Sequence, residues 1–285
     1  MVDILVQGML LGGLYALFAL GQSLMFGVMR LTNTAQGDFI VLAAFAAIAA
    51  AGAWTLHPAL VGAMLLPVAF VIGYALQRGV LNRTLGRDPL PSLVVTFGLA
   101  IVIQNGLLQA FSADPRSLDA GALATASWRV GEHGIGVLPL LTFAAAVVAT
   151  GGLQWLSSGT ALGRRFRAVS DDREAAELMG LDARHVYALA TGTAFVLIAL
   201  AGVLQALRTT VAPADGSMLL LFAFEAVIIG GMGSFWGTLA GAVLLGVTQQ
   251  LGAWVDPAWG LWAGHVAFLA VLLARPQGLW PKTKG

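Results

Sequence analysis

Long apolar runs separated by short polar turns divide this sequence along its whole length. The first run extends from Ile4 to about Val28, with polar side chains at Gln7, Gln22 and Ser23. A helix rises about 1.5 Å per residue, so roughly 20 such residues cross about 30 Å of bilayer hydrocarbon. Because lipid offers no partners to exposed backbone groups, the pattern predicts a bundle of membrane-spanning helices.

The runs predict an all-α, polytopic fold with eight or nine membrane segments. We expect eight clear spans near residues 4–28, 39–53, 59–77, 91–111, 137–156, 186–207, 236–254 and 259–274. A ninth run, from about Met218 to Gly231, is short for a crossing and contains Glu225. It is a half-helix, a re-entrant piece or a tilted span that its neighbours bury. Residues 1–285 are expected to form one transmembrane domain with a cytoplasmic loop at about 160–185.

The residue composition is typical of a membrane protein with closely packed helices. Hydrophobic residues occupy 58% of the 285 positions, charged residues occupy 10%, and there are 36 glycines. Small side chains allow helix backbones to approach one another in lipid. The net charge of +1 is unlike that of a nucleic-acid-binding surface. The absence of cysteine excludes disulfides, a thiol nucleophile and thiolate metal sites.

Basic residues in the loops predict the orientation of the chain. Segments rich in arginine or lysine face the cytoplasm. Three segments qualify, with Arg78, Arg83 and Arg87, with Arg164, Arg165, Arg167, Arg173 and Arg184, and with Arg275, Lys282 and Lys284. The loop at 112–136 then lies outside, as does the N-terminus, and nine crossings fit better than eight. Because the chain opens with Asp3 instead of a basic region, we expect a retained first helix, not a signal peptide.

Two similar segments suggest an inverted repeat. The segments AQGDFIVLAAF (35–45) and ADGSMLLLFAF (214–224) share Ala, Gly, Ala and Phe in register. Each leads from a polar turn into an apolar helix, and the predicted topology puts the two turns on opposite membrane faces. Inverted repeats in transporters place interrupted helices near the bilayer midplane, where helix ends meet the substrate. The alternative is a chance similarity between two membrane segments of low diversity.

The most charged stretch, REAAELMGLDARHV (173–186), predicts a short polar helix. Asp171 and Glu174 have the spacing of an N-terminal capping box, and Gly180 is a natural C-terminal stop. We expect one apolar face, made by Ala175, Leu178 and Met179, while Arg173, Glu174 and Glu177 face water. Such a helix either docks in a groove of another protein or is a solvated loop helix.

Polar side chains within the apolar runs are candidates for lining a translocation path. They are Gln22, Asn33, Gln36, Gln104, Asn105 and Glu225. An acid at membrane depth needs a partner or a wet cavity, so Glu225 either lines a path or bonds between helices. The neutral residues have the same two interpretations. For Asp38 we expect an N-cap on a helix that begins at Phe39.

Two other function classes fit the sequence less well. An intramembrane hydrolase needs a nucleophile beside a base, and neither Ser234 nor His265 lies in a Gly-x-Ser-x-Gly or H-E-x-x-H motif. We therefore predict that the chain is not an enzyme. An ion-coupled secondary carrier would use Glu225 and the repeat without any ATPase. Such a carrier has no use for the polar helix at 173–180, so we keep it as the alternative.

Four blocks of the sequence resemble one family of transport proteins. EAAELMG (174–180) is similar to the EAA-x3-G cytoplasmic loop of ATP-binding-cassette (ABC) importer permeases. The surrounding segment 165–204, together with 13–39, 224–246 and 274–280, resembles permeases of the branched-chain amino acid (LIV-type) family, closest to the LivH-like half of a LivH/LivM pair. Gln36 stands where that family usually has histidine.

The resemblance implies a subunit of a larger importer in the bacterial inner membrane. Its partners are a second, LivM-like permease, two ATPases and a periplasmic or lipid-anchored binding protein. ATP and Mg²⁺ bind to the ATPases and this chain binds no cofactor; the sequence also lacks a G-x-x-x-x-G-K-[ST] motif. The implied ATPase-coupling residues are Arg173, Glu174, Ala175, Ala176, Glu177, Leu178, Met179 and Gly180. Branched-chain amino acids are the leading cargo, with urea, short amides and aromatic or dicarboxylic acids as alternatives.

Overall fold

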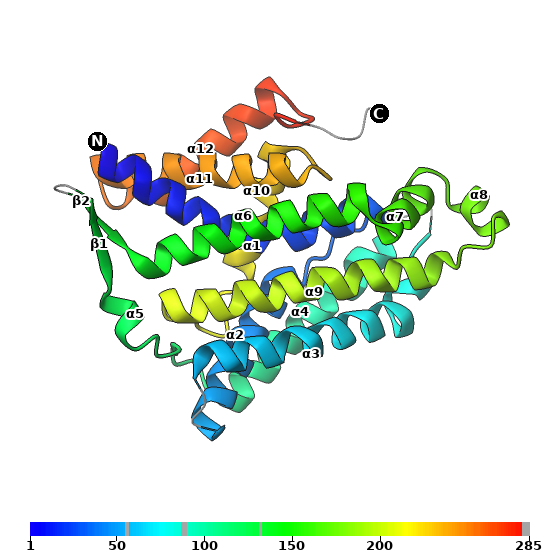
Figure 1. Cartoon of the computed structure of the whole chain (residues 1–285), viewed down its shortest axis with the longest axis horizontal. Coiled ribbons are helices and arrows are strands. Elements are labelled where there is room, and N and C mark those ends of the chain that lie inside the picture. Colours follow the sequence, from blue (N-terminus) through cyan, green and yellow to red (C-terminus); the bar gives the residue numbers. More distant parts are fainter. Residues whose placement is uncertain (55–56, 87–89, 131–132, 281–285) are drawn as a thin grey trace.

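The computed structural model describes residues 1–54, 57–86, 90–130 and 133–280, which form a helical bundle with one small hairpin (Figure 1). The nine apolar helices of the bundle are α1 (Val2–Met29), α2 (Gln36–Trp54), α3 (Pro58–Gly79), α4 (Leu90–Phe111), α6 (Val137–Gly159), α9 (Ala183–Arg208), α10 (Gly216–Gly230), α11 (Phe235–Val255) and α12 (Trp259–Ala274). The all-α, polytopic prediction is confirmed. Arg87, Lys282 and Lys284 lie outside the described residues.

The helix lengths correct one detail of the predicted spans. Within the described ranges, seven helices are long and apolar enough to cross a membrane. The short segment expected near Met218 is α10, of 15 residues. The last predicted span is also short, since α12 has 16 residues, so seven spans are clear by length instead of eight.

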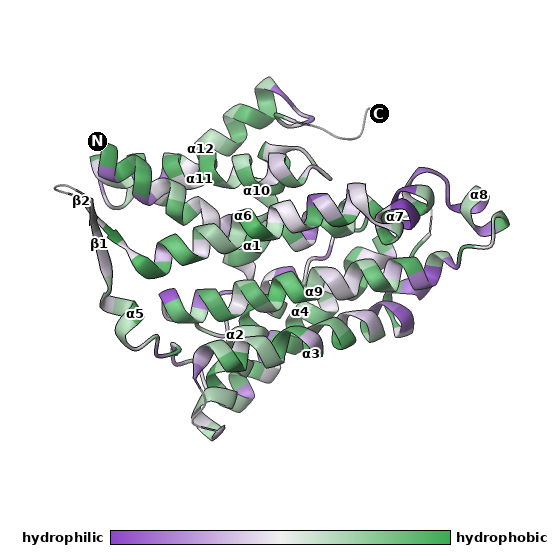
Figure 2. Ribbon diagram, in the orientation of Figure 1, coloured by the Kyte–Doolittle hydropathy of each residue, from purple (hydrophilic) through white to green (hydrophobic). Residues whose placement is uncertain are grey.

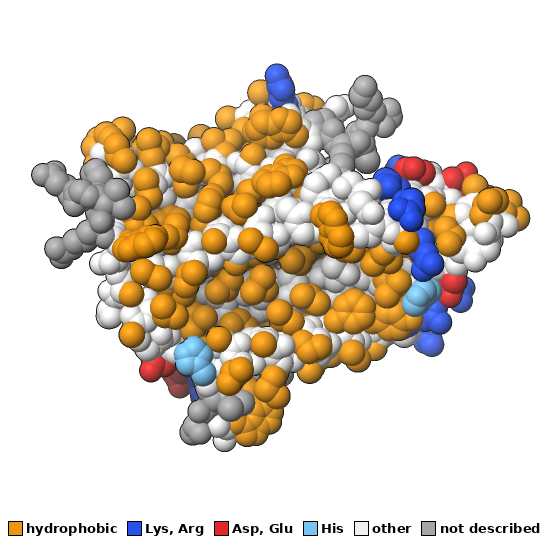
Figure 3. Space-filling model, viewed as in Figure 1, with side chains coloured by type: hydrophobic (Ala, Val, Ile, Leu, Met, Phe, Trp, Pro, Cys, Tyr) orange, Lys and Arg blue, Asp and Glu red, His pale blue; other side chains and the backbone are white. Residues whose placement is uncertain are grey.

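Short elements that do not span the bundle lie at its two ends. At one end lie the N-terminus, α5 (Ala122–Thr125) and the antiparallel hairpin of β1 (Ser127–Val130) and β2 (His133–Gly136) (Figure 1). At the other end α7 (Ala161–Asp171) and α8 (Arg173–Leu178) project beyond the apolar helices, and polar residues concentrate there (Figure 2). The space-filling view places a band of arginine side chains at this end (Figure 3). The predicted loop at 160–185 is thus largely helical. Helix α8 was expected there, whereas α7 was not.

The helix contacts repeat when the two halves of the chain are exchanged. Helix α1 packs along α11 as α9 packs along α3, and α2 packs on α9 as α10 packs on α1. Small residues permit these close contacts: a Cβ added to Gly12 would lie 2.5 Å from the Cα of Val243 on α11. The pattern agrees with the predicted inverted repeat and places α1 and α9 at the centre.

Two stretches of non-helical backbone precede α2 and α10. In the first, the amide of Ala35 donates to Asn33 Oδ1 (3.0 Å), and the amide of Thr34 donates to Thr96 Oγ1 on α4 (3.3 Å). In the second, Val211 exchanges two backbone hydrogen bonds with Arg116 of the 112–120 loop. These partners are needed because lipid cannot satisfy free backbone groups.

Candidate functional site

Helix α8 is capped at its start by an aspartate, one residue later than predicted. Asp171 is the last residue of α7, so the capping box with Glu174 is wrong. Asp172 takes the N-cap position, and its Oδ1 accepts a hydrogen bond from the amide of Ala175 (3.0 Å). The extra helix α7 shifts the start by one residue, which the sequence pattern could not indicate.

The end of α8 agrees with the prediction for Gly180. This residue has φ +85°, a left-handed conformation that glycine adopts without steric cost. The amide of Gly180 donates to the carbonyl of Glu177 (3.0 Å), and the amide of Leu181 donates to the carbonyl of Ala176 (3.1 Å). Together they form a Schellman motif, which fixes the direction in which the chain leaves the helix.

One side of α8 rests on the bundle and the other is open. Ala176 is buried, whereas Leu178 and Met179 are 89% and 84% exposed. Ala175 and Glu174 are exposed as well. The predicted apolar face therefore exists, and no described residue covers it.

Arg173 does not simply face water, as was expected for the charged residues of α8. Its side chain is half-buried, its Nε donates to Glu177 Oε1 (3.0 Å), and its guanidinium lies 6.0 Å from the ring centroid of Tyr187 on α9. A cation over an aromatic ring is attracted by the ring's electron density. Arg173 thus helps to attach α8 to α9.

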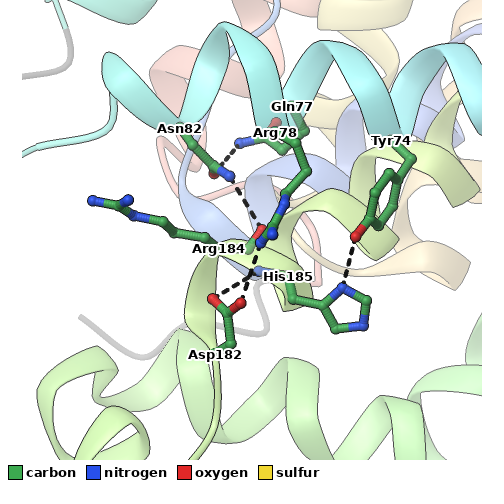
Figure 4. Close-up of polar contacts among 7 residues, drawn as sticks. All are labelled: Tyr74, Gln77, Arg78, Asn82, Asp182, Arg184 and His185. Carbon is green, nitrogen blue, oxygen red and sulfur yellow. Dashed lines mark hydrogen bonds and ion pairs between the residues drawn. The ribbon is translucent and has the colours of Figure 1, made fainter.

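A polar cluster joins the start of α9 to the end of α3 directly after α8 (Figure 4). Arg78 pairs with Asp182 (3.1 Å), Tyr74 Oη bonds His185 Nδ1 (2.9 Å), and Asn82 Nδ2 donates to the carbonyl of Arg184 (3.2 Å). Asn82 lies in the short 3₁₀-helix η1 (Leu81–Arg83). We call these residues the α3–α9 clamp; the sequence analysis had used its arginines only as orientation signals.

Asp182 caps α9 and is held in its charged form. The amide of His185 donates to Asp182 Oδ1 (3.1 Å), and this bond, followed by Arg78, lowers the pKa of Asp182 from its usual value. Hydrogen bonds to a carboxylate stabilise the ionised state. Asp182 can therefore pair with Arg78 as a carboxylate at neutral pH.

The second candidate region lies where α2 and α10 begin. An ideal Cβ on Gly37 would lie 1.8 Å from the carbonyl oxygen of Gly216, so the two helix starts touch. These glycines occupy the same register position in the two similar segments (35–45 and 214–224). The contact corrects the prediction that the two turns lie on opposite membrane faces, because the starts of α2 and α10 meet inside the bundle.

Asp38 lies in this contact, although not as the predicted cap. Helix α2 begins at Gln36, so Asp38 is buried in its first turn, and its Oδ1 would lie 2.2 Å from a Cβ on Gly216. The carboxylate thus adjoins the N-terminal turns of both α2 and α10. Partial positive charge at helix N-termini favours an acid in this place.

Three of the predicted path residues gather near this contact. Gln22, Asn33 and Gln36 are buried. Gln36 Nε2 donates to the carbonyl of Phe18 (2.7 Å) on α1, while Gln36 Oε1, Asn33 Nδ2 and both amide atoms of Gln22 have no hydrogen-bond partner among the described residues. Buried polar atoms usually have partners, so these side chains are candidates for contacts with water or solute.

Gln104 and Asn105 do not join them. Asn105 is exposed on α4 and donates back to the carbonyl of Ile101 (2.8 Å), while Gln104 is half-buried on the same helix. They would line a path only if it ran between this chain and a second subunit.

Glu225 makes the interhelix bond that was one of its two interpretations. His265 Nδ1 on α12 lies 2.6 Å from Glu225 Oε1, while Glu225 Oε2 is buried without a partner in the described chain. Ser234 instead caps α11 by accepting from the amide of Gly237 (3.2 Å), so Ser234 and His265 do not form a nucleophile–base pair. The sequence analysis missed His265 as the partner of Glu225, since 40 residues separate them.

Comparison with known proteins places the chain in a family. A family model described as branched-chain amino acid transport system / permease component matches residues 4–274. The permease protein BraD of Pseudomonas aeruginosa, from a high-affinity branched-chain amino acid transport system, is 28% identical and covers 96% of this chain and 94% of its own length. LivH of Escherichia coli (strain K12), with the same description, is 26% identical over 96% of this chain and 93% of its own length.

A more distant relative shows that cargo varies. The fructose import permease protein FrcC of Rhizobium meliloti is 30% identical over 73% of this chain and 62% of its own length. The match to the family model, in contrast, spans nearly the whole sequence. The relatives are components of larger transport systems. The comparisons therefore do not favour the alternative of a self-sufficient ion-coupled carrier. This chain belongs to the family of permease components of branched-chain amino acid transport systems.

Proposed function

We propose that this chain is a membrane-spanning subunit of an ABC importer in the bacterial inner membrane. The observation that carries the proposal is α8, a helix capped at both ends that presents Leu178 and Met179 beyond the apolar bundle. A self-contained channel or carrier gains nothing from two exposed apolar side chains on a projecting polar element. A groove on a partner ATPase would cover them.

The remaining components belong to other chains. Two ATPases bind ATP and Mg²⁺ and supply the work, a second permease completes the membrane part, and a periplasmic or lipid-anchored binding protein delivers the solute. This chain itself catalyses no reaction. Exposed apolar side chains on α4, such as Val94, Phe97 and Val102, leave room for a second membrane subunit as well as for lipid.

The α3–α9 clamp offers a route from α8 to the membrane core. Closure of the ATPases would move residues 173–180, and the clamp would pass this movement to α3 and α9 together. Helix α9 packs on α2, whose start touches α10 at Gly37 and Gly216. The bundle would thereby change between inward-open and outward-open states, with Gln22, Asn33, Gln36 and Glu225 along the path.

Branched-chain amino acids are the proposed cargo. The curated relatives that cover almost the whole chain carry that description, whereas the fructose permease covers less of it. Selection would belong mainly to the binding protein. Urea, short amides and aromatic or dicarboxylic acids are the alternatives to be screened with that protein.

The test is uptake by the complete transporter, co-expressed with its partners and reconstituted in liposomes. Wild type should accumulate radiolabelled L-leucine only with ATP inside. Leu178→Ser with Met179→Ser should abolish both uptake and transport-stimulated ATP hydrolysis. Leu273→Ser is the matched control, because Leu273 on α12 is 86% exposed but lies outside α8. Equal uptake by the double variant would refute the docking role.

A further inference from the structure

A cavity of about 420 Å³ opens at the end of the bundle that carries the N-terminus and the hairpin. Its walls come from α1, β2, the start of α6, the end of α9 and the end of α11. The predicted topology places this end outside the cell. Sites for small molecules are typically about 300–1,000 Å³, apolar, and equipped with a few polar groups, and this cavity has that character.

Arg208, the last residue of α9, supplies the cation of the cavity. It is half-buried, and its Nη1 donates to the backbone carbonyl of Leu10 (3.2 Å) on α1. That carbonyl is the one hydrogen-bond acceptor for Arg208 in the described chain. A guanidinium has five N–H donors in a planar fork that fits a carboxylate in a bidentate manner, so most of its capacity remains for a ligand.

A purely structural role for Arg208 would need fewer hydrogen-bond donors than a guanidinium offers. A cation at the C-terminus of α9 complements the helix dipole, and the bond to Leu10 ties α9 to α1. A lysine would serve both purposes. The structural role does not account for the donors that remain on a guanidinium lining a cavity.

Acceptors for a positive group line the same cavity. Gln250 Nε2 donates to Gln7 Oε1 (3.4 Å), which leaves the Gln250 carbonyl oxygen as an acceptor. Leu11, Ile135 and Pro139 provide apolar wall between and around these polar groups.

We propose that this cavity is an outer binding site for the zwitterion of a small apolar α-amino acid. Arg208 binds the α-carboxylate, the amide oxygens of Gln7 and Gln250 bind the ammonium, and the apolar wall holds the side chain. The inference rests on the proposed function and adds a site at which this chain itself recognises the cargo after release from the binding protein. Recognition by both charged groups would reject fatty acids and amines of the same shape.

Binding can be measured on the complete transporter in nanodiscs, without nucleotide and without the binding protein. The probes are L-leucine, L-leucinamide, which lacks the carboxylate, and 4-methylpentanoate, which lacks the ammonium. Wild type should prefer L-leucine over both analogues. Arg208→Gln should weaken L-leucine about tenfold or more and leave L-leucinamide unchanged, because one charge-assisted pair is lost. Arg208→Lys should lose part of the preference for L-leucine over L-leucinamide.

The control is Arg116→Gln, since Arg116 lies in the 112–120 loop outside the cavity and is expected to leave all three affinities unchanged. Equal melting temperatures of Arg208→Lys and wild type would show that the fold is kept. Unchanged discrimination between leucine and leucinamide in Arg208→Gln overturns the proposal. So does a phospholipid that co-purifies with wild type, is absent from Arg208→Gln and is not displaced by leucine.

The same preparation separates this inference from the proposed function. If wild type shows no ATP-dependent uptake with its binding protein present, the proposed function fails. If uptake is normal and Arg208→Gln has the wild-type KM for leucine, the outer site fails and the importer assignment stands.

Discussion

At the scale of single side chains, the buried amide groups without partners are the leading candidates for contact with the solute. Gln22 on α1 is buried, and neither its Oε1 nor its Nε2 has a partner in the described chain. An unsatisfied buried polar group costs about 1–3 kcal/mol, so we expect a water molecule or the solute to satisfy these atoms. The same argument applies, for single atoms, to Gln36 and Asn33.

Gln22→Met tests this balance. Because Met fills a similar volume and has no strong polar atoms, the free energy of unfolding of the variant should be no more than about 1 kcal/mol below that of wild type, and it can be higher. Its leucine uptake should fall. Thermal unfolding in detergent and initial uptake rates measure the two quantities, and a destabilised variant with normal uptake would show that Gln22 is a structural residue.

The Asp182–Arg78 pair makes a pH-dependent contribution. The folded-state pKa of Asp182 lies below its usual value, so the pair adds stability above the unfolded-state pKa, and this stability is lost as pH falls through the folded-state pKa. Asp182→Asn keeps a capping side chain but loses the charge. The variant should be less stable than wild type at pH 7, by no more than about 1 kcal/mol for an exposed pair, and the difference should narrow as the pH falls toward 3.

Melting curves of both proteins from pH 7 down to pH 3 measure this difference. A gap that stays constant over the whole range would contradict an electrostatic origin.

At the scale of the helix, the features most relevant to transport are the starts of α2 and α10, each preceded by non-helical backbone, and the projecting helix α8. Helices α2 and α10 start in contact through glycines, and α8 stands on one buried alanine with its apolar face open. Both features depend on glycine, in one case for space and in the other for backbone conformation.

Gly37→Ala should prevent the two helix starts from meeting. The new methyl group would lie 1.8 Å from the Gly216 carbonyl oxygen, and backbone cannot move aside as a flexible side chain can. We expect severe loss of folded protein in the membrane fraction, as judged by size-exclusion chromatography. Gly52→Ala is the control in the same helix, because nothing lies within 4 Å of its added Cβ; this variant should fold and transport normally.

Gly180 should tolerate only residues that accept a left-handed conformation. At φ +85°, Gly180→Val would strain the end of α8 by roughly 1–2 kcal/mol or more and should abolish ATP-driven uptake while the protein remains inserted. Gly180→Asn should retain more activity, since asparagine adopts this conformation more readily. Equal activities of the two variants would exclude a role for the turn geometry.

The positions of the helices were predictable from the sequence because hydropathy and length report directly on membrane spans. The predicted starts and ends differ from those observed by a few residues, for example 186–207 against Ala183–Arg208. The end of α8 followed from Gly180, whereas its start did not, since Asp171 and Asp172 both suit a cap. Long-range partners such as Glu225 with His265, or Arg78 with Asp182, depend on packing between distant segments that no local pattern encodes.

At the scale of the whole molecule, the surface is that of a subunit. Exposed apolar side chains lie along α3, α4 and α12, and the apolar face of the projecting helix α8 is also exposed. The relation between the two halves places α1 and α9 centrally and leaves these peripheral helices to lipid or to a partner.

Purification of the untruncated operon product should therefore yield a heteromer. Native mass spectrometry is expected to find this chain with a second permease and two ATPases. The chain expressed alone should insert but show no ATP-dependent uptake. Solute accumulation by the isolated chain under an ion gradient would instead restore the secondary carrier.

The contact between the starts of α2 and α10 also means that α2 is synthesised well before the segment on which it packs. Residues 30–35 are non-helical, and the helix start that follows them packs on a segment that begins about 180 residues later. At about 5–20 residues per second, a ribosome needs roughly 10 to 40 s to supply that segment. During this time the first turn must stay shielded from acyl chains, by the insertion machinery or by α4 through Thr96. Biogenesis of the chain thus depends on protection of an unfinished first half.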